Sequence, residues 1–403
     1  MNDPMIDVAI IGGGPAGIAA ALRLKARGVP RVTIIEREEV TGGVPRHCGH
    51  PPFGMREFGR ILSGPAYARR LASAAQAAGV EILLRHSVVA LLPGGGLTMA
   101  APDGVKQIKA RRVLLATGAR ETSRAARLVG GTRPIGVLNT GALQAYVTLH
   151  GLVPFRRPVV VGTELVSLSA LSICRHHNIR PVAMVEANPR LTASWPFTLY
   201  PKLLGVPLYL NATIDRIDGI SRVERVVLSN GQSLDCDGVL FTGQFLPEAS
   251  LVQASHLRLD DGTRGPAVDQ YGRCSDLAYF AAGNLLRPVE SAGWSFREGT
   301  LAGDYIADDL SGGLPSTEGA LEVLAGEGVR FVLPQRLAHV VPLRGWLQLR
   351  VGAPVQGQLR IRAGEAVLYR RRVNARPERR ILIELTGIKT PPDDARLIVE
   401  IVP

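Results

Sequence analysis

Residues 6–36 read IDVAIIGGGPAGIAAALRLKARGVPRVTIIE. The stretch begins with an apolar run over 6–11 that predicts a buried strand, and it continues with a glycine-rich turn over 12–17. An Ala- and Leu-rich segment then predicts a helix over 18–26, and a second apolar run ends at Glu36. A strand, a helix and a strand in this order predict a βαβ unit with parallel strands.

The glycine turn has the spacing of a dinucleotide-binding site. Gly12, Gly14 and Gly17 form the pattern Gly-x-Gly-x-x-Gly between the predicted strand and helix, and Glu36 follows about 20 residues later. Gly12 permits the tight turn, Gly14 lets backbone amides approach a pyrophosphate, and Gly17 lets the helix pack on the strand. The helix N-terminus stabilises the phosphates, and Glu36 is expected to accept hydrogen bonds from ribose hydroxyls.

A second βαβ unit follows later in the chain. A strand over 159–161, a helix over 166–176 and a strand that leads to Glu186 repeat the opening order. The turn reads Gly162-Thr163-Glu164-Leu165-Val166-Ser167, so that Glu164 stands where the second glycine would be. Its bulk and its negative charge both oppose an incoming pyrophosphate. We therefore expect an impaired site, in which NAD is favoured over NADP because no Arg replaces Glu186.

Length and composition predict a multidomain protein that is folded throughout. The chain has 403 residues, of which 46% are hydrophobic and 20% are charged. Its best apolar run, 158–173, is interrupted by Glu164 and by serines, so no transmembrane helix is predicted. The first residues have no basic segment or cleavage site of a secretory signal, and we expect the cytoplasm as the location.

The formal net charge of +12 bears on the partners of the protein. Lysines and arginines are spread along the chain, without a basic block that alternates with aromatic residues, and nucleic acid is therefore not an expected partner. The charge is consistent with solubility and with docking to an acidic subunit. The positive charge is also compatible with peripheral contact with a membrane surface.

Two segments beyond the first unit are typical of flavoproteins. One is Leu114–Glu121, which contains Ala116-Thr117-Gly118, and the other is Leu277–Asn284. Together with the glycine turn they resemble the motifs of the glutathione-reductase-like superfamily, whose members have two dinucleotide-binding domains. The resemblance covers roughly residues 5 to 315 and implies noncovalent FAD at the first turn. Asn284 departs from the superfamily's usual Asp beside the ribityl chain, but an Asn can also form hydrogen bonds there.

The resemblance implies an α/β fold class with two Rossmann-like domains. We expect a discontinuous FAD-binding domain, 1–128 and 245–315, and a degenerate NAD(P)-binding-like domain over 129–244. From 316 to 403 the pattern changes to short alternating strands without long helices, which predicts a small C-terminal all-β domain similar to a sandwich.

The candidate FAD contacts combine the glycine turn with the segments that the resemblance singles out. The amides at the start of the helix that follows Ser291 are expected to stabilise negative charge on the reduced flavin. The full set is Gly12, Gly14, Pro15, Ala16, Gly17, Glu36, Gly43, Arg46, Val88, Ala116, Thr117, Gly118, Gly283, Asn284, Ser291 and Ala292.

The loop after the second strand lacks the dithiol of the disulfide reductases. It reads Gly42-Gly43-Val44-Pro45-Arg46-His47-Cys48-Gly49-His50, with no Cys-x4-Cys pair, so reduction of a disulfide substrate is disfavoured. A zinc site made by His47, Cys48 and His50 is the minority interpretation, because no fourth ligand is evident, and no metal is expected. The catalytic residues stay open, with the candidates Arg46, His47, Cys48, His50 and Trp294.

The continuation of this loop to Gly54 and the segment Gly136–Gln144 resemble one branch of the superfamily. That branch contains the FAD subunits of opine oxidases, hydrogen cyanide synthase and hydroxyproline- or proline-type dehydrogenases. The resemblance implies oxidation of a small amine or amino acid, as in amino-acid catabolism, by a hetero-oligomer with a second catalytic or electron-accepting subunit. The alternatives are a stand-alone NADH-dependent flavin reductase and a non-catalytic subunit that relays electrons or positions a partner.

The tail from residue 316 onward carries Arg370-Arg371-Arg372 and Arg379-Arg380 but contains no Cys. An iron-sulfur cluster ligated by this tail is therefore excluded. We expect the tail to contact a partner subunit rather than the flavin. The alternative is a domain that covers its own chain, because small sandwiches serve both purposes.

Overall fold

The computed structural model describes residues 5–338, 343, 345–392 and 395–402. The chain divides into two compact units. Unit 1 comprises Met1–Gly43, Arg69–Ala119 and Pro247–Pro403, and unit 2 comprises Val44–Ala68 and Arg120–Leu246. Residues 44–68, which the sequence pattern assigns to the FAD-binding domain, are thus part of unit 2. The proposed domain boundaries themselves stay a prediction.

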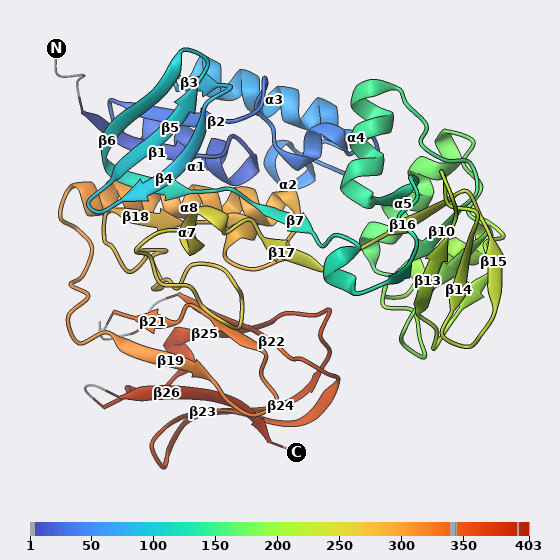
Figure 1. The fold of residues 1–403 in the computed structure, drawn as a ribbon. Coiled ribbons are helices and arrows are strands. Elements are labelled where there is room, and N and C mark those ends of the chain that lie inside the picture. Colours follow the sequence, from blue (N-terminus) through green and yellow to red (C-terminus); the bar gives the residue numbers. More distant parts are fainter. Residues whose placement is uncertain (1–4, 339–342, 344, 393–394, 403) are drawn as a thin grey trace. The chain divides into compact units, whose positions relative to one another are not determined.

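The main sheet of unit 1 is built on the predicted βαβ opening (Figure 1). Its strand order is β3-β2-β1-β6-β5-β4, and β18 also pairs with β6. β1 is parallel to both neighbours, with Ile10 opposite Ile34 and Leu114, and all three side chains are fully buried. The strands are β1 (Ile6–Ile11), β2 (Val32–Glu36), β3 (Glu81–Leu84), β4 (Ser87–Leu92), β5 (Gly96–Ala101), β6 (Gly104–Leu115) and β18 (Tyr279–Ala281).

Helices α1 (Pro15–Ala26) and α8 (Ala292–Leu310) pack closely in unit 1. A Cβ added at Gly299 would lie 2.0 Å from the carbonyl oxygen of Ala16, so a glycine is required for this approach. α8 begins at Ala292, because Ser291 caps the helix by accepting a hydrogen bond from the amide of Trp294. The other α-helical segments that the structure describes in unit 1 are α3 (Gly64–Ala77), whose first residues belong to unit 2, and α7 (Ser250–Gln253).

Unit 2 contains the second predicted βαβ unit. Its parallel sheet has the order β12-β11-β10-β16-β9, and an additional sheet has the order β15-β14-β13-β8. The strands are β8 (Gly130–Gly131), β9 (Val137–Asn139), β10 (Pro158–Val161), β11 (Ala183–Val185), β12 (Leu208–Tyr209), β13 (Ile214–Asp218), β14 (Arg225–Leu228), β15 (Ser233–Asp235) and β16 (Gly238–Phe241). Its helices are α2 (Met55–Phe58), α4 (Thr140–His150), α5 (Leu165–His176) and α6 (Tyr200–Leu203). The chain passes between the units at β7 (Ala119–Glu121) and β17 (Phe245–Pro247), among other points.

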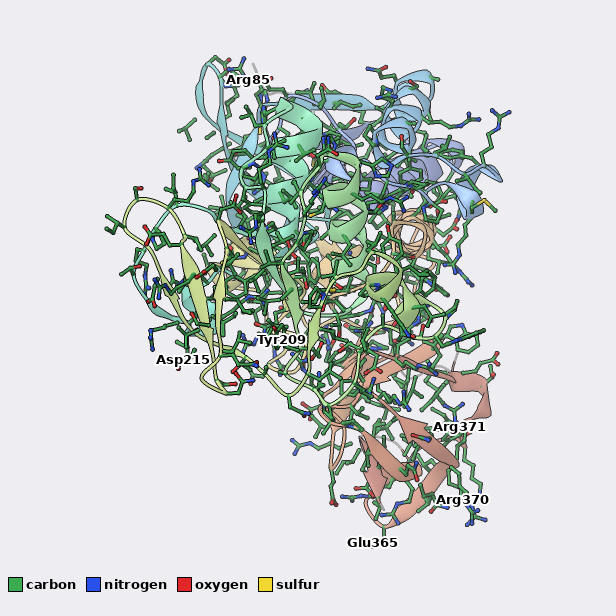
Figure 2. All side chains as sticks on the ribbon, turned by 90° about the vertical axis from the view of Figure 1, so that its right-hand side faces the viewer. Arg85, Tyr209, Asp215, Glu365, Arg370 and Arg371 are labelled. Atoms are coloured by element: carbon green, nitrogen blue, oxygen red, sulfur yellow. The ribbon has the colours of Figure 1, made fainter. Side chains whose placement is uncertain are left out.

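The C-terminal tail forms the predicted small β-sandwich within unit 1. One sheet has the order β21-β19-β26-β23-β24 and the other the order β20-β22-β25, and their buried side chains share one core. The strands are β19 (Leu321–Ala325), β20 (Phe331–Leu333), β21 (Arg336–Leu337), β22 (Trp346–Arg350), β23 (Val355–Ala363), β24 (Ala366–Ala375), β25 (Ile381–Glu384) and β26 (Arg396–Val402). Arg370 and Arg371 are exposed on β24, at the outer edge of the sandwich (Figure 2). Among the described residues, no helix combines the length and apolar character needed to span a bilayer.

Candidate functional site

The turn between β1 and α1 has the geometry of a phosphate-binding loop. Gly12 has a φ of +108°, and a Cβ there would lie 2.5 Å from the carbonyl oxygen of Ala116. A Cβ at Gly17 would lie 2.0 Å from the carbonyl oxygen of Gly12. Gly14 is the N-cap of α1, and no side chain in the described part of the protein caps it. The first amides of α1, in the turn that Pro15 begins, are thus available to an anion.

The backbone of Gly43 completes this turn from the loop after β2. A Cβ at Gly43 would lie 2.9 Å from the Cα of Gly14, and the amide of Gly42 donates to the carbonyl oxygen of Gly13 at 2.7 Å. A Cβ at Gly14 would still be 3.8 Å from the Cα of Gly43. The two glycines therefore form a cradle that side chains would fill, which fits the pyrophosphate of FAD.

Glu36 lies at the end of β2 with a buried carboxylate. Its Oε2 accepts from the amide of Gly13 at 2.8 Å, and its Oε1 accepts from the amide of Glu38 at 3.0 Å. Each carboxylate oxygen has a second lone pair, so Glu36 can also accept hydrogen bonds from two ribose hydroxyls. The position and the remaining acceptor capacity fit the adenosine of FAD.

The two later flavoprotein segments lie next to this turn in unit 1. The amide of Ala116 donates to the carbonyl oxygen of Ile11 at 2.9 Å, and the hydroxyl of Thr117 donates to that of Glu248 at 2.7 Å. Gly118 has a φ of +79°. A Cβ at Gly283 would lie 2.9 Å from the Cβ of Ala16. The structure thus brings Ala116 to the glycine turn and Gly283 to the start of α1.

The remaining candidate FAD contacts of unit 1 include Val88 and Asn284. Val88 is partly buried on β4 and packs against the main core. The side-chain oxygen of Asn284 accepts from the amide of Glu290 at 2.7 Å, and its nitrogen donates to the carbonyl oxygen of Glu290 at 3.1 Å. This pairing explains why an Asn is suited to position 284, since an Asp could not donate. Contacts of Asn284, Ser291 and Ala292 with FAD stay a prediction.

The catalytic candidates of the loop after β2 lie in unit 2. Arg46 and His47 are in a short 3-10 helix, and Nδ1 of His47 is 3.4 Å from the carbonyl oxygen of Gly141. The thiol of Cys48 is buried, whereas His50 pairs with its neighbour Pro51. The described residues contain no group of three or more His, Cys, Asp or Glu side chains arranged to hold a metal ion.

A partly buried acid that the sequence pattern did not single out lies beside this loop in unit 2. Glu121 Oε2 accepts from the amide of Gly141 at 2.7 Å, and desolvation raises the pKa of Glu121 to about 7. Arg127, whose charge opposes this shift, donates to the carbonyl oxygens of Thr242 and Gly243 at 3.1 and 2.8 Å. The flavoprotein segment Leu114–Glu121 ends at Glu121, but only the fold reveals its burial.

The second glycine turn repeats the geometry of the first with different side chains. Gly162 has a φ of +113°, close to that of Gly12, and its amide donates to the carbonyl oxygen of Val185 at 2.8 Å. A Cβ at Gly162 would lie 2.7 Å from Oε2 of Glu164, and one at Gly243 would lie 2.8 Å from Oε1. The carboxyl of Glu164 therefore fills the space between the ends of β10 and β16. Burial of the carboxyl raises the pKa of Glu164. The bulk of this side chain obstructs a pyrophosphate in either protonation state.

Glu186, the counterpart of Glu36 in the second turn, already accepts hydrogen bonds within unit 2. Oε2 of Glu186 accepts from the hydroxyl of Thr163, which takes the place of Gly13 in the first turn, and from that of Thr192 at 3.3 Å. Oε1 accepts from the amide and the side-chain nitrogen of Asn188 at 2.9 and 2.7 Å. The lone pairs that would receive ribose hydroxyls are therefore used within unit 2.

Comparison with known proteins identifies the family of the chain. Residues 6–299 match the family described as pyridine nucleotide-disulphide oxidoreductase, which is well over half of the chain. The chain belongs to this family. It is an FAD-dependent oxidoreductase, and its fold is the one shared by the flavoprotein reductases of the family.

The relatives of this chain are named for different activities. An opine oxidase subunit of Rhizobium meliloti is 28% identical over 45% of this chain, and the match covers 38% of the relative. The ferredoxin--NAD(+) reductase subunit of the benzene 1,2-dioxygenase system of Pseudomonas putida is 27% identical over 71% of this chain and 68% of the relative. The structure of L-proline dehydrogenase from P. horikoshii has a TM-score of 0.58 and 23% identity, over 76% of this chain and 56% of that one. This last likeness concerns the fold alone.

Proposed function

We propose that this protein is the FAD-bearing subunit of a hetero-oligomeric dehydrogenase for a small amine or amino acid. When bound, FAD would supply two-electron redox chemistry between a substrate and an acceptor. In this role the amine substrate loses two electrons and two protons, and its C–N single bond becomes the C=N bond of an imine. A partner subunit or a small acceptor takes up the electrons.

The observation that carries the proposal is the filled second turn of unit 2. Glu164 lies between Gly162 and Gly243, and Glu186 accepts hydrogen bonds from its own neighbours. NAD(P)H would have to displace the first carboxyl and compete for the second, which makes it a poor source of electrons. A substrate that is oxidised directly at the flavin, or on a partner, is then the better source.

The proposed substrate class is based on the names of two relatives. The opine oxidase relative of Rhizobium meliloti and the hydrogen cyanide synthase relative HcnB of Pseudomonas protegens, which is 34% identical over 44% of this chain, are both named as subunits. Each match covers 38% of the relative, so neither extends to the whole protein. The names support an amine or amino-acid substrate and a second subunit.

The decisive experiment is anaerobic reduction of the flavin by candidate donors. The chain is purified alone and together with the proteins encoded beside it, and the loss of the oxidised flavin spectrum is followed after addition of amino acids, secondary amines or NADH. We expect an amine or amino acid to bleach the flavin of the complex. Bleaching by micromolar NADH alone, with no response to any amine, would contradict the proposal.

The second candidate is an NADH-dependent flavin reductase for a ferredoxin-like acceptor. It is favoured by the reductase subunit of the benzene 1,2-dioxygenase system, whose match is longer than that of the opine oxidase relative. The same anaerobic experiment separates the two, because this candidate requires rapid reduction by NADH.

A further inference from the structure

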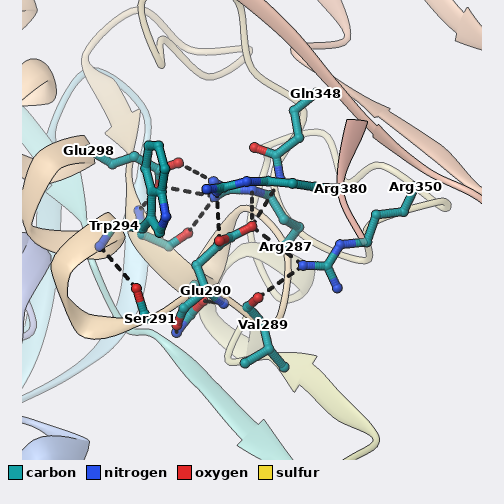
Figure 3. Close-up of polar contacts among 11 residues, drawn as sticks. Arg287, Val289, Glu290, Ser291, Trp294, Glu298, Gln348, Arg350 and Arg380 are labelled. Carbon is teal, nitrogen blue, oxygen red and sulfur yellow. Dashed lines mark hydrogen bonds and ion pairs between the residues drawn. The ribbon is translucent and has the colours of Figure 1, made fainter. Parts of the chain in front are cut away.

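A buried carboxylate joins the C-terminal sandwich to the start of α8 within unit 1. Glu290, which directly precedes the N-cap of α8, is 8% exposed. Its Oε2 accepts from Nη1 of Arg380 at 2.7 Å, and its Oε1 accepts from Nε2 of Gln348 at 3.1 Å and from Nη2 of Arg350 at 3.4 Å (Figure 3). All three donors belong to the sandwich. Glu290 thus has its strongest partners outside its own segment.

Side chains alternate between the two faces of β22, and this places Gln348 and Arg350 on the face that lies toward Glu290. Leu347 and Leu349 are fully buried in the core of the sandwich, so Gln348 and Arg350 point to the opposite face of the strand. β25 pairs with β22, and Ile381 lies opposite Leu349. Arg380, just before β25, is therefore close to the same face, and Glu290 receives two cations and an amide from one side.

The backbone of Glu290 is held from the other side by Asn284. The side-chain amide of Asn284 pairs with both the amide and the carbonyl of Glu290, at 2.7 and 3.1 Å. Arg350 also donates to the carbonyl oxygen of Val289 at 3.0 Å. The segment that leads into α8 is thus fixed between Asn284, which follows β18, and the sandwich, and a shift of the sandwich would move the first turn of α8.

The first turn of α8 is also in direct contact with the sandwich. The guanidinium carbon of Arg380 lies 3.7 Å from the centroid of the Trp294 ring, which is a cation–π distance. Arg380 therefore touches both the residue before the cap and a residue of the first turn, as Figure 3 shows.

The cluster carries an excess of positive charge. Arg287 is completely buried and forms an ion pair with Glu298, and its Nε is 4.0 Å from Oε1 of Glu290. The guanidinium groups of Arg287, Arg350 and Arg380 therefore face the two carboxylates Glu290 and Glu298. The N-terminus of α8 adds the positive end of a helix dipole. Any group that gains negative charge beside this turn is stabilised.

We propose that the C-terminal sandwich tunes the reduction potential and the affinity of FAD by holding the first turn of α8 through Glu290, Arg380 and Trp294. Glu290 and Arg380 act as positioning residues. The proposal rests on the FAD-dependent function and on the predicted approach of Ser291 and Ala292 to the flavin. It assigns Arg380, which directly precedes β25, to the cofactor site of its own chain.

Two substitutions of opposite sign test this proposal. Arg380→Met removes a positive charge, and we expect the reduced flavin to become less stable, with about a tenfold change in the oxidised-to-reduced ratio against a reference dye. For a two-electron couple, this corresponds to about 30 mV toward lower potential. Glu290→Gln removes a negative charge and should shift the potential in the opposite direction. FAD is also expected to dissociate several-fold more readily from Arg380→Met.

The matched control is Arg379→Met, which removes the same charge from the adjacent, exposed arginine. We expect it to leave the potential and the FAD affinity at the wild-type values. If Arg380→Met does not fold, Arg380→Gln removes the same charge, and Glu290→Gln still reports the opposite sign. Equal potentials in Glu290→Gln and the wild type, or shifts of the same sign in both charge variants, would overturn the proposal. The dye measurement uses no amine or NADH, so its outcome is independent of which substrate the protein oxidises.

Discussion

The thiol of Cys48 donates a hydrogen bond to the side-chain oxygen of Gln144, with Sγ and Oε1 3.2 Å apart. Desolvation and, to a lesser extent, the charge of Glu121 raise the pKa of Cys48 to about 12. The reactive thiolate is thereby disfavoured, which argues against Cys48 as a nucleophile.

We expect Cys48 to react slowly with a thiol reagent in the native protein at pH 8. Its thiolate fraction should be about three orders of magnitude below that of an unperturbed Cys. The rate is measured by mass spectrometry of the labelled Cys48 peptide, with protein unfolded in guanidinium as the control. Labelling of native Cys48 as fast as in the unfolded chain would contradict a buried thiol.

Glu121 should make stability fall as the pH rises from about 4.5 to 7. Its folded pKa of about 7 lies above the unfolded value, so the folded state retains the proton over this range. The loss is on the order of 1 to 3 kcal/mol. In Glu121→Gln, which cannot ionise, this part of the pH dependence should disappear. Denaturant unfolding of both proteins at pH 5 and pH 8 measures it, and an identical pH dependence would exclude the raised pKa.

Gly14→Glu should abolish retention of FAD. The added carboxylate would project into the cradle between Gly14 and Gly43, where the pyrophosphate is expected. Gly14→Ala is the control: Gly14 has a φ of −83°, which an Ala adopts without strain, and its Cβ would be 3.8 Å from the Cα of Gly43. The ratio of flavin to protein absorbance after gel filtration reports the result. A fully yellow Gly14→Glu protein would refute the assignment of the first turn.

Glu164→Gly should increase the rate at which NADH reduces the flavin. The substitution empties the space between Gly162 and Gly243, although Glu186 remains paired with Thr163. We expect slow reduction of the wild type and at least a tenfold acceleration in the variant, measured by anaerobic stopped flow. NADPH should remain the poorer donor of the two. Rapid reduction of the wild type by NADH would show that Glu164 moves aside.

Charge reversal of Arg370, Arg371 and Arg372 should weaken assembly with an acidic partner subunit. All three are exposed on β24, an edge strand of the sandwich. Because exposed charges are screened by salt, the difference from the wild type should shrink as the ionic strength rises. Co-purification with the proteins encoded beside it at low and high salt measures the effect. A salt-independent difference would indicate a role in folding instead.

Local sequence was sufficient for the elements that carry the cofactor. The spacing of Gly12, Gly14 and Gly17 and the acid at Glu36 predicted a strand, a turn and a helix, because only glycine permits the close backbone approaches at Gly12 and Gly17. The same pattern located the second unit and the obstruction at Glu164. The branch of the family, the substrate and the residue contacts with FAD stay predictions.

Only the tertiary structure determined which distant side chains are in contact and which ionisable groups are desolvated. Arg380 and Glu290 are 90 residues apart in the chain, and no periodicity links them, so their contact follows from the packing of the sandwich on the rest of unit 1. The burial that raises the pKa of Glu121 and Cys48 depends in the same way on segments distant in sequence. Local pattern determines backbone conformation through steric limits on nearby residues. Desolvation and long-range ion pairs depend on which surfaces meet, and only the folded chain fixes that.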